Sequence, residues 1–123
     1  MMLGLGCDLC DVARIERALE RPRFLERVYT PAERARIARR GSETAAGLFA
    51  AKEAVSKALG TGFRGFGFQD IEVIPDAMGR PVCGLTGGAL VRLQAMGGLR
   101  VWVSISHSGG FAMAVAVVEG GAV

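Results

Sequence analysis

The sequence predicts an α+β fold in which a mainly antiparallel sheet packs against helices. Runs at 3–9, 101–106 and 111–118 alternate in polarity or stay apolar, as strands do. Several segments between the first and second of these runs repeat apolar residues at helical spacing. The chain has 123 residues, half of them hydrophobic, so we expect a single domain over 1–123 with enough apolar material for a core.

The chain is expected to open with a strand over 3–9, because leucine and cysteine alternate there with glycine and Asp8. This alternation leaves one face of the strand nearly bare, with room for a bulky neighbour, and Asp8 lies on that face. Asp11 is then placed to cap a helix that reaches about Glu20. The apolar stripe of this helix comprises Val12, Ile15 and Leu19.

Two further helices are expected before the glycine-rich segment 60–67. The sequence Thr-Pro-Ala-Glu at 30–33 combines an N-cap threonine, a proline at the first position and a glutamate at the third. That helix should end at about Arg40, and the next is expected over 43–59. Its apolar stripe comprises Leu48, Ala51, Val55, Ala58 and Leu59.

The second half of the chain reads mainly as strands, at about 69–75, 80–85, 101–106 and 111–118, with a short helix over 88–96. The last strand is apolar on both faces, whereas a sheet packed on helices buries only one. We expect a symmetric partner to cover the other face. The alternative is that the chain's own helices cover both faces.

Composition argues against a membrane protein and indicates a mildly basic one. The longest apolar run, 111–118, is far shorter than the roughly 20 residues of a spanning helix. The N-terminus lacks the basic and apolar regions of an export signal, so we expect a cytoplasmic protein. The net charge is +3, and most of the basic residues precede Gly65, which indicates a basic face for an acidic partner. Nucleic acid is not the partner we expect, because no aromatic-basic repeat is present.

The three cysteines are interpreted as small buried thiols, because reduced thiols are the default in a chain without an export signal. Cys7 and Cys10 have the spacing of a redox motif, and Cys83 with His107 would complete a zinc set. Zinc ligands usually come in two tight pairs, whereas Cys83 and His107 are far apart in the sequence.

One helix carries the first candidate site residues. Glu53 and Lys57 are four residues apart and share a face with Phe49, while Lys52 projects to the side. An ordinary exposed ion pair has the same spacing, but this segment is otherwise poor in charge and runs into the glycine-rich loop. With Asp8 from the strand, Glu53 would give the two carboxylates that are enough for Mg²⁺. For Asp8 the alternative is a helix cap shared with Asp11.

Two more groups are candidates for binding. His107 follows Ser104 and Ser106 and precedes two glycines, a set that suits a phosphate-binding edge, although a lone histidine is more often structural. Arginines at i, i+3 and i+7 oppose the apolar stripe of the first helix and fit docking of an acidic protein; a solvated surface is the alternative. These arginines are Arg14, Arg17 and Arg21.

Three segments together resemble a known family: GLGCDLCDVARIERAL, FAAKEAVSKALGTG and VSISHSGGFAMAVAVV, in this order. They are similar to the holo-acyl-carrier-protein synthases, the small 4′-phosphopantetheinyl transferases, over nearly the whole chain. The resemblance implies the fold of that family and a Mg²⁺-dependent enzyme of fatty acid biosynthesis. Such an enzyme moves phosphopantetheine from coenzyme A to a serine of apo-acyl carrier protein and releases adenosine 3′,5′-bisphosphate. The length fits the short type, which forms homotrimers with active sites between subunits.

The resemblance also implies roles for single residues. Asp8 and Glu53 match the metal ligands and, with Lys57, the catalytic residues. Contacts to coenzyme A are implied for Lys57 and His107, and less specifically for Lys52. Contacts to the carrier protein are implied for Arg14 and Arg21.

Two positions depart from the family pattern. Leu48 stands where many relatives have an arginine thought to help bind the 3′-phosphate of coenzyme A, and Ser108 stands where others have Asp, Glu or Thr. Leucine cannot hold a phosphate, so either another basic residue replaces the arginine or the affinity for nucleotide is lower.

Three other functions fit parts of the sequence. A non-enzymatic module that binds coenzyme A or a nucleotide would not need both Asp8 and Glu53. A Mg²⁺-dependent hydrolase of nucleotide pyrophosphates would not need the arginine stripe. A basic nucleic-acid-binding module would carry a larger excess of positive charge.

Overall fold

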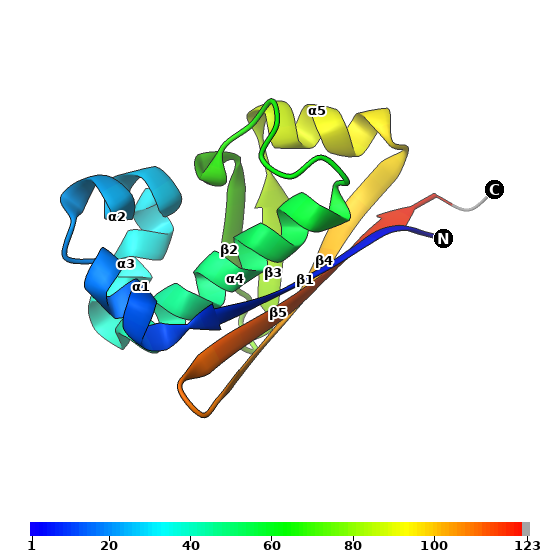
Figure 1. The fold of residues 1–123 in the computed structure, drawn as a ribbon. Coiled ribbons are helices and arrows are strands. Elements are labelled where there is room, and N and C mark those ends of the chain that lie inside the picture. Colours follow the sequence, from blue (N-terminus) through cyan, green and yellow to red (C-terminus); the bar gives the residue numbers. More distant parts are fainter. Residues whose placement is uncertain (122–123) are drawn as a thin grey trace.

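The structure, a computed structural model, describes residues 1–121 and has the α+β architecture expected from the sequence (Figure 1). The elements, in chain order, are β1 (Met2–Asp11), α1 (Val12–Ala18), α2 (Pro22–Val28), α3 (Pro31–Arg40), α4 (Ser42–Ala58), the 3₁₀ turn η1 (Phe68–Asp70), β2 (Ile71–Pro75), β3 (Pro81–Leu85), α5 (Gly87–Ala95), β4 (Gly98–Ser108) and β5 (Phe111–Gly120). Helix α4 crosses the middle of the molecule, with α1, α2 and α3 gathered at its N-terminal end and α5 near the other (Figure 1). No helix within residues 1–121 is long and apolar enough to cross a membrane.

The strands are antiparallel, as predicted, but they form two sheets rather than one. The larger sheet has the order β1-β5-β4, and β2 pairs with β3 in a separate hairpin. Strand β5 is therefore central: Asp8 of β1 pairs with Ala114, and His107 of β4 pairs with Ala112. Asp8 and His107 therefore lie on the two strands that flank β5 in the larger sheet.

Helix α4 lies on the bare face of β1. A Cβ atom on Gly6 would lie 2.1 Å from the carbonyl oxygen of Ala54, and one on Gly4 would lie 2.0 Å from that of Ala58. Only glycine permits this approach, because any side chain would overlap the helix backbone. The space that we expected for a bulky neighbour is therefore filled by α4, which brings its last turns against the end of β1.

The other face of the larger sheet stays uncovered. The small side chains of Ala112, Ala114 and Ala116 are fully buried under α4, whereas Phe111 and Met113 on the opposite face are each 45% exposed. Leu5, Leu9 and Trp102 are also exposed on the neighbouring strands. The alternative in which the chain's own helices cover both faces is therefore wrong.

Helix starts follow the predicted caps. The Asp11 carboxylate accepts a hydrogen bond of 2.9 Å from the backbone N–H of Ala13, and Thr30 and Glu33 form a reciprocal capping box. Helix α1, however, ends at Ala18 rather than near Glu20, so Arg21 lies at the N-cap of α2 and does not continue the arginine stripe. Helix α2 itself was not predicted, although Pro22 at its first position is a helix-start signal.

Candidate active site

The end of β1 and the last turns of α4 bring Asp8 and Lys57 together. The Lys57 ammonium lies 3.1 Å from Asp8 Oδ1 and donates a second hydrogen bond, of 2.9 Å, to the carbonyl oxygen of Cys7. Both side chains reach solvent, with 52% of Lys57 and 20% of Asp8 exposed. The pair is therefore open to a ligand, and as an exposed ion pair it adds little to stability on its own.

Glu53 lies one helical turn before Lys57 and completes the acidic part of the site. Partial burial raises the pKa of Glu53, and the nearby Asp8 carboxylate raises it further, while Lys57 and Arg14 oppose these effects. Two carboxylates in electrostatic contact at a half-buried position repel each other. This repulsion is relieved by a bound cation or by a proton.

The donor set fits Mg²⁺ better than a transition metal. No group of three or more His, Cys, Asp or Glu side chains able to hold an ion occurs within residues 1–121. Mg²⁺ needs only one or two protein carboxylates when substrate phosphates and water complete its shell. Asp8 and Glu53 supply hard oxygen ligands of this kind.

His107 lies at another part of α4. Its Nε2 lies 2.8 Å from the carbonyl oxygen of Glu43, so this nitrogen carries the hydrogen, and its ring packs on Gly47. A helix rises about 1.5 Å per residue, so the turn at Glu43 is about 15 Å along α4 from Glu53. Within one chain, the structure does not bring His107 to the carboxylates.

Lys52 is not placed to bind coenzyme A. Its ammonium is fully buried, pairs with the fully buried Glu33 carboxylate and donates to the carbonyl oxygens of Val28 and Phe68. Burial lowers the pKa of Lys52, and the charge and hydrogen bond of Glu33 oppose this effect. Glu33 also accepts from the N–H groups of Thr30 and Val73. We therefore replace the predicted binding role with a structural one, in which Lys52 joins α4 to α3, β2 and η1.

Lys52→Met is expected to lower the free energy of unfolding by roughly 3 kcal/mol, because it leaves the Glu33 carboxylate buried without its charge partner. Urea denaturation would measure the loss, and the double variant with Glu33→Gln should regain part of it. The KM for coenzyme A of the folded variant should stay unchanged. A raised KM with unchanged stability would restore the binding role.

The cysteines do not form a cluster with chemical function. Cys10 is buried and Cys83 is half-buried, but Cys7 is exposed, so the prediction of a buried thiol is wrong for Cys7. None of the three forms a disulfide within the described residues 1–121. Burial, helped by the nearby Asp8 charge, raises the pKa of the Cys10 thiol to about 11, and burial raises that of Cys83 to about 12. Both thiols are therefore protonated and weakly reactive near neutral pH.

A row of aromatic rings beside the site was only partly anticipated. Phe49, which we placed on the Glu53 face, stacks on Phe24 of α2 at 6.0 Å between ring centroids and on Phe68 at 5.5 Å. Sequence alone could not indicate that Phe24 and Phe68 would join Phe49, because the three rings come from separate elements.

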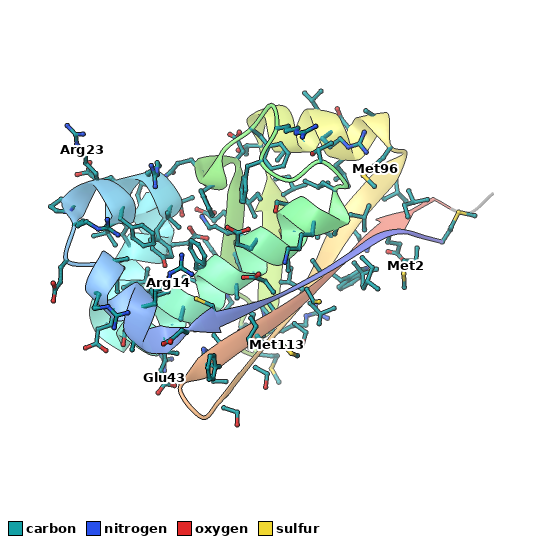
Figure 2. All side chains as sticks on the ribbon, in the orientation of Figure 1. Met2, Arg14, Arg23, Glu43, Met96 and Met113 are labelled. Atoms are coloured by element: carbon teal, nitrogen blue, oxygen red, sulfur yellow. The ribbon has the colours of Figure 1, made fainter. Side chains whose placement is uncertain are left out.

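Arg14 lies on the exposed side of α1, near α4 (Figure 2).

Comparison with known proteins identifies the class to which this fold and site belong. Residues 4–116 match the 4′-phosphopantetheinyl transferase superfamily, and the chain belongs to this family of enzymes. The holo-[acyl-carrier-protein] synthase of Solidesulfovibrio magneticus is 52% identical over 123 residues, which cover 98% of this chain and 100% of the relative.

Solved structures agree with the sequence relatives. The Helicobacter pylori holo-[acyl-carrier-protein] synthase in complex with coenzyme A is similar with a TM-score of 0.84 and 36% identity, over 94% of this chain and 99% of that one. The Bacillus anthracis holo-(acyl-carrier-protein) synthase in complex with CoA (3′,5′-ADP) has a TM-score of 0.82 and 39% identity, over 98% and 99%. The resemblance found in the sequence is therefore confirmed for the family and its fold.

Proposed function

We propose that this protein is a Mg²⁺-dependent holo-acyl-carrier-protein synthase of the cytoplasm that activates the carrier for fatty acid biosynthesis. It would transfer 4′-phosphopantetheine from coenzyme A to a serine of apo-acyl carrier protein and release adenosine 3′,5′-bisphosphate. The observation that carries the proposal is the meeting of Asp8, Glu53 and Lys57 at the end of β1 in a chain of this family.

Each residue of this site has a role in the proposed reaction. Asp8 and Glu53 would hold Mg²⁺, which neutralises charge on transferring and departing phosphates. Lys57 adds fixed positive charge beside the pyrophosphate. The serine oxygen forms a bond to the β-phosphorus, and the bond from that phosphorus to the bridging oxygen breaks. The serine proton passes to one of the two carboxylates or to a water beside them.

We further propose that three chains assemble and place each active site between two subunits. The uncovered face of the β1-β5-β4 sheet supports this, because it exposes apolar side chains that a second copy would bury. The separation of about 15 Å along α4 between Glu43, the hydrogen-bond partner of His107, and Glu53 also supports it. His107 would then contact coenzyme A that is held by the carboxylates of a neighbouring chain.

The test is the intact mass of apo-acyl carrier protein after incubation with coenzyme A and Mg²⁺. Addition of one phosphopantetheine to the carrier, with release of adenosine 3′,5′-bisphosphate, is the expected result. An unchanged carrier mass would disprove the transferase. Release of adenosine 3′,5′-bisphosphate without carrier would indicate a hydrolase, and binding without either product would indicate a binding module.

Arg14→Glu is expected to raise the KM for acyl carrier protein by about tenfold or more, with a smaller effect on the KM for coenzyme A. The reversed charge repels an acidic partner and slows its encounter. Arg23→Glu is the matched control, because it makes the same charge change on α2, where Arg23 points away from the site (Figure 2). A larger effect on the KM for coenzyme A would assign Arg14 to the nucleotide instead.

A further inference from the structure

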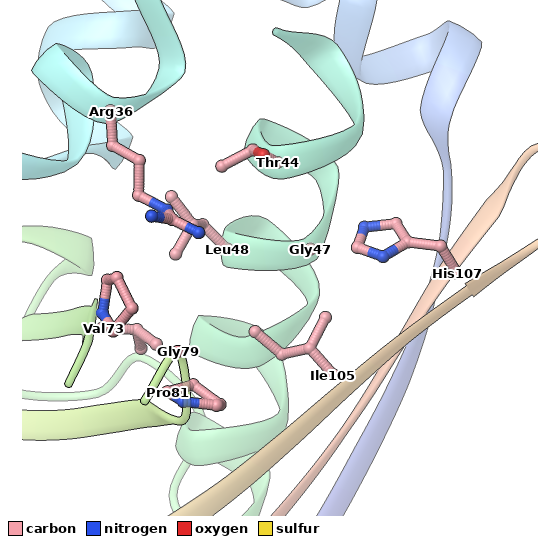
Figure 3. A pocket seen from close by; sticks show the side chains of 10 residues that line it. Arg36, Thr44, Gly47, Leu48, Val73, Gly79, Pro81, Ile105 and His107 are labelled. Carbon is pink, nitrogen blue, oxygen red and sulfur yellow. The ribbon is translucent and has the colours of Figure 1, made fainter. Parts of the chain in front are cut away.

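A cavity of about 180 Å³ lies beside α4, away from the carboxylate site (Figure 3). Helices α3 and α4, the β2–β3 hairpin and β4 all contribute to its walls. Its lining includes Arg36, Thr44, Leu48, Pro81, Ile105 and His107. None of the described residues that line it is an aspartate or glutamate, so Arg36 gives the cavity a positive charge that no lining acid offsets.

Arg36 is the unusual member of this lining. It reaches from α3 toward α4 and lines the same cavity as Leu48 (Figure 3). The side chain is half-buried, yet among residues 1–121 it has no ion pair and no side-chain hydrogen bond.

Arginines elsewhere in the chain show the contrast. Arg34 on the same helix donates to the carbonyl oxygen of Tyr29, Arg92 donates to that of Leu59, and Arg100 pairs with Glu119. A guanidinium is always charged and presents five N–H donors. No buried side-chain nitrogen or oxygen of residues 1–121 lacks a partner, so the donors of Arg36 reach solvent and are free to bind an anion in this cavity.

The size of the cavity and the nature of its donors select the anion. At about 30 Å³ per water, the cavity holds roughly six waters. Sites for whole drug-sized ligands are several times larger, about 300–1,000 Å³. One phosphate group therefore fits inside the cavity, and the rest of a nucleotide would lie outside it. The guanidinium fork matches a phosphate with two parallel hydrogen bonds, and the Thr44 hydroxyl offers a further donor.

We propose that Arg36 binds the 3′-phosphate of coenzyme A in this cavity and so sets the preference of the enzyme for coenzyme A over its 3′-dephospho form. This proposal rests on the proposed function. Coenzyme A carries three phosphates, and the two in its pyrophosphate belong to Asp8, Glu53 and Lys57 of the neighbouring chain in the proposed assembly. The remaining monoester needs its own cation. Leu48 cannot supply one, and Arg36, carried by a different helix, brings a guanidinium to the cavity that Leu48 lines.

The experiment compares transfer from coenzyme A and from 3′-dephospho-coenzyme A, measured by the mass of the carrier protein. For Arg36→Ala, kcat/KM with coenzyme A should fall by about tenfold or more, as expected for loss of a charge-assisted hydrogen bond. The kcat/KM of Arg36→Ala with 3′-dephospho-coenzyme A should stay near that of the unchanged enzyme with the same substrate. Arg39→Ala is the matched control, because it removes the same charge from the exposed side of α3. Introducing Leu48→Arg into Arg36→Ala should return the preference.

Equal losses with both substrates would overturn the proposal, because they would show a general effect on folding or charge. So would an unchanged preference. If Arg36→Ala does not fold, as judged by its melting curve, Arg36→Gln replaces it in the same comparison.

If no form of the enzyme modifies the carrier, the proposed function fails, but Arg36 can still be tested by calorimetry. Adenosine 3′,5′-bisphosphate should then bind the unchanged protein more tightly than AMP does, and Arg36→Ala should remove that difference; equal binding of the two would refute the role of Arg36.

Discussion

Glu53→Gln is expected to lower transfer to the carrier protein by about a hundredfold or more while leaving the fold intact. The amide keeps the shape of the side chain but removes one of the two charges that would hold Mg²⁺ against the pyrophosphate. The measurement is the rate of carrier modification over a range of Mg²⁺ concentrations. Glu20→Gln is the control, because Glu20 is exposed in the turn after α1. Normal turnover of Glu53→Gln at low Mg²⁺ would exclude the metal role.

The raised pKa of Glu53 gives the same variant a second signature, in thermal stability. A raised pKa means that the folded state binds this proton more tightly than the unfolded state does. The contribution of Glu53 to the free energy of unfolding therefore increases as the pH falls through the raised pKa, and it decreases as the pH rises. At neutral pH the ionised Glu53 opposes folding, so Glu53→Gln should melt higher than the unchanged protein when Mg²⁺ is absent. Mg²⁺ should raise the melting temperature of the unchanged protein and have little effect on the variant.

Met113→Glu is expected to convert the assembled protein to single chains and to reduce transfer to background. Met113 lies on the uncovered face of the central strand β5, between Leu9 of β1 and Ser106 of β4 (Figure 2). A charge there is solvated in the single chain but would be buried without a partner in an assembly. Sedimentation at micromolar concentration gives the mass, and the carrier assay gives the activity.

The control for this variant is Met78→Glu, which places the same charge at a position that is 92% exposed in the turn between β2 and β3. It should leave both the mass and the activity unchanged. A Met113→Glu chain that is monomeric and fully active would show that each active site is complete within one chain. An unchanged trimer mass would show that this sheet face is not the interface.

Local features of the fold were predictable because they depend on neighbours in the sequence. The capping box at Thr30 and Glu33 needs only residues three apart, and the alternation in β1 and β4 follows from the two-residue period of a strand. The shared face of Glu53 and Lys57 follows in the same way from the helical period. Helix α2 was not predicted because it is short, and Pro22 and Phe24 are only weak indications of a separate helix.

The sequence by itself thus determined the family, the α+β class, most helix ends and the residue types of the candidate site. Only the tertiary structure decided which of these residues meet. The two glycines of β1 admit the backbone of α4 and so bring Asp8 to Lys57, which is a contact across 49 positions of the sequence. Helical spacing alone could not show that Lys52 points into the core toward Glu33 while its neighbour Glu53 faces Asp8. It also could not show that Arg36 of α3 lines the same cavity as Leu48 of α4, because the packing of two helices is set by side chains distant in sequence.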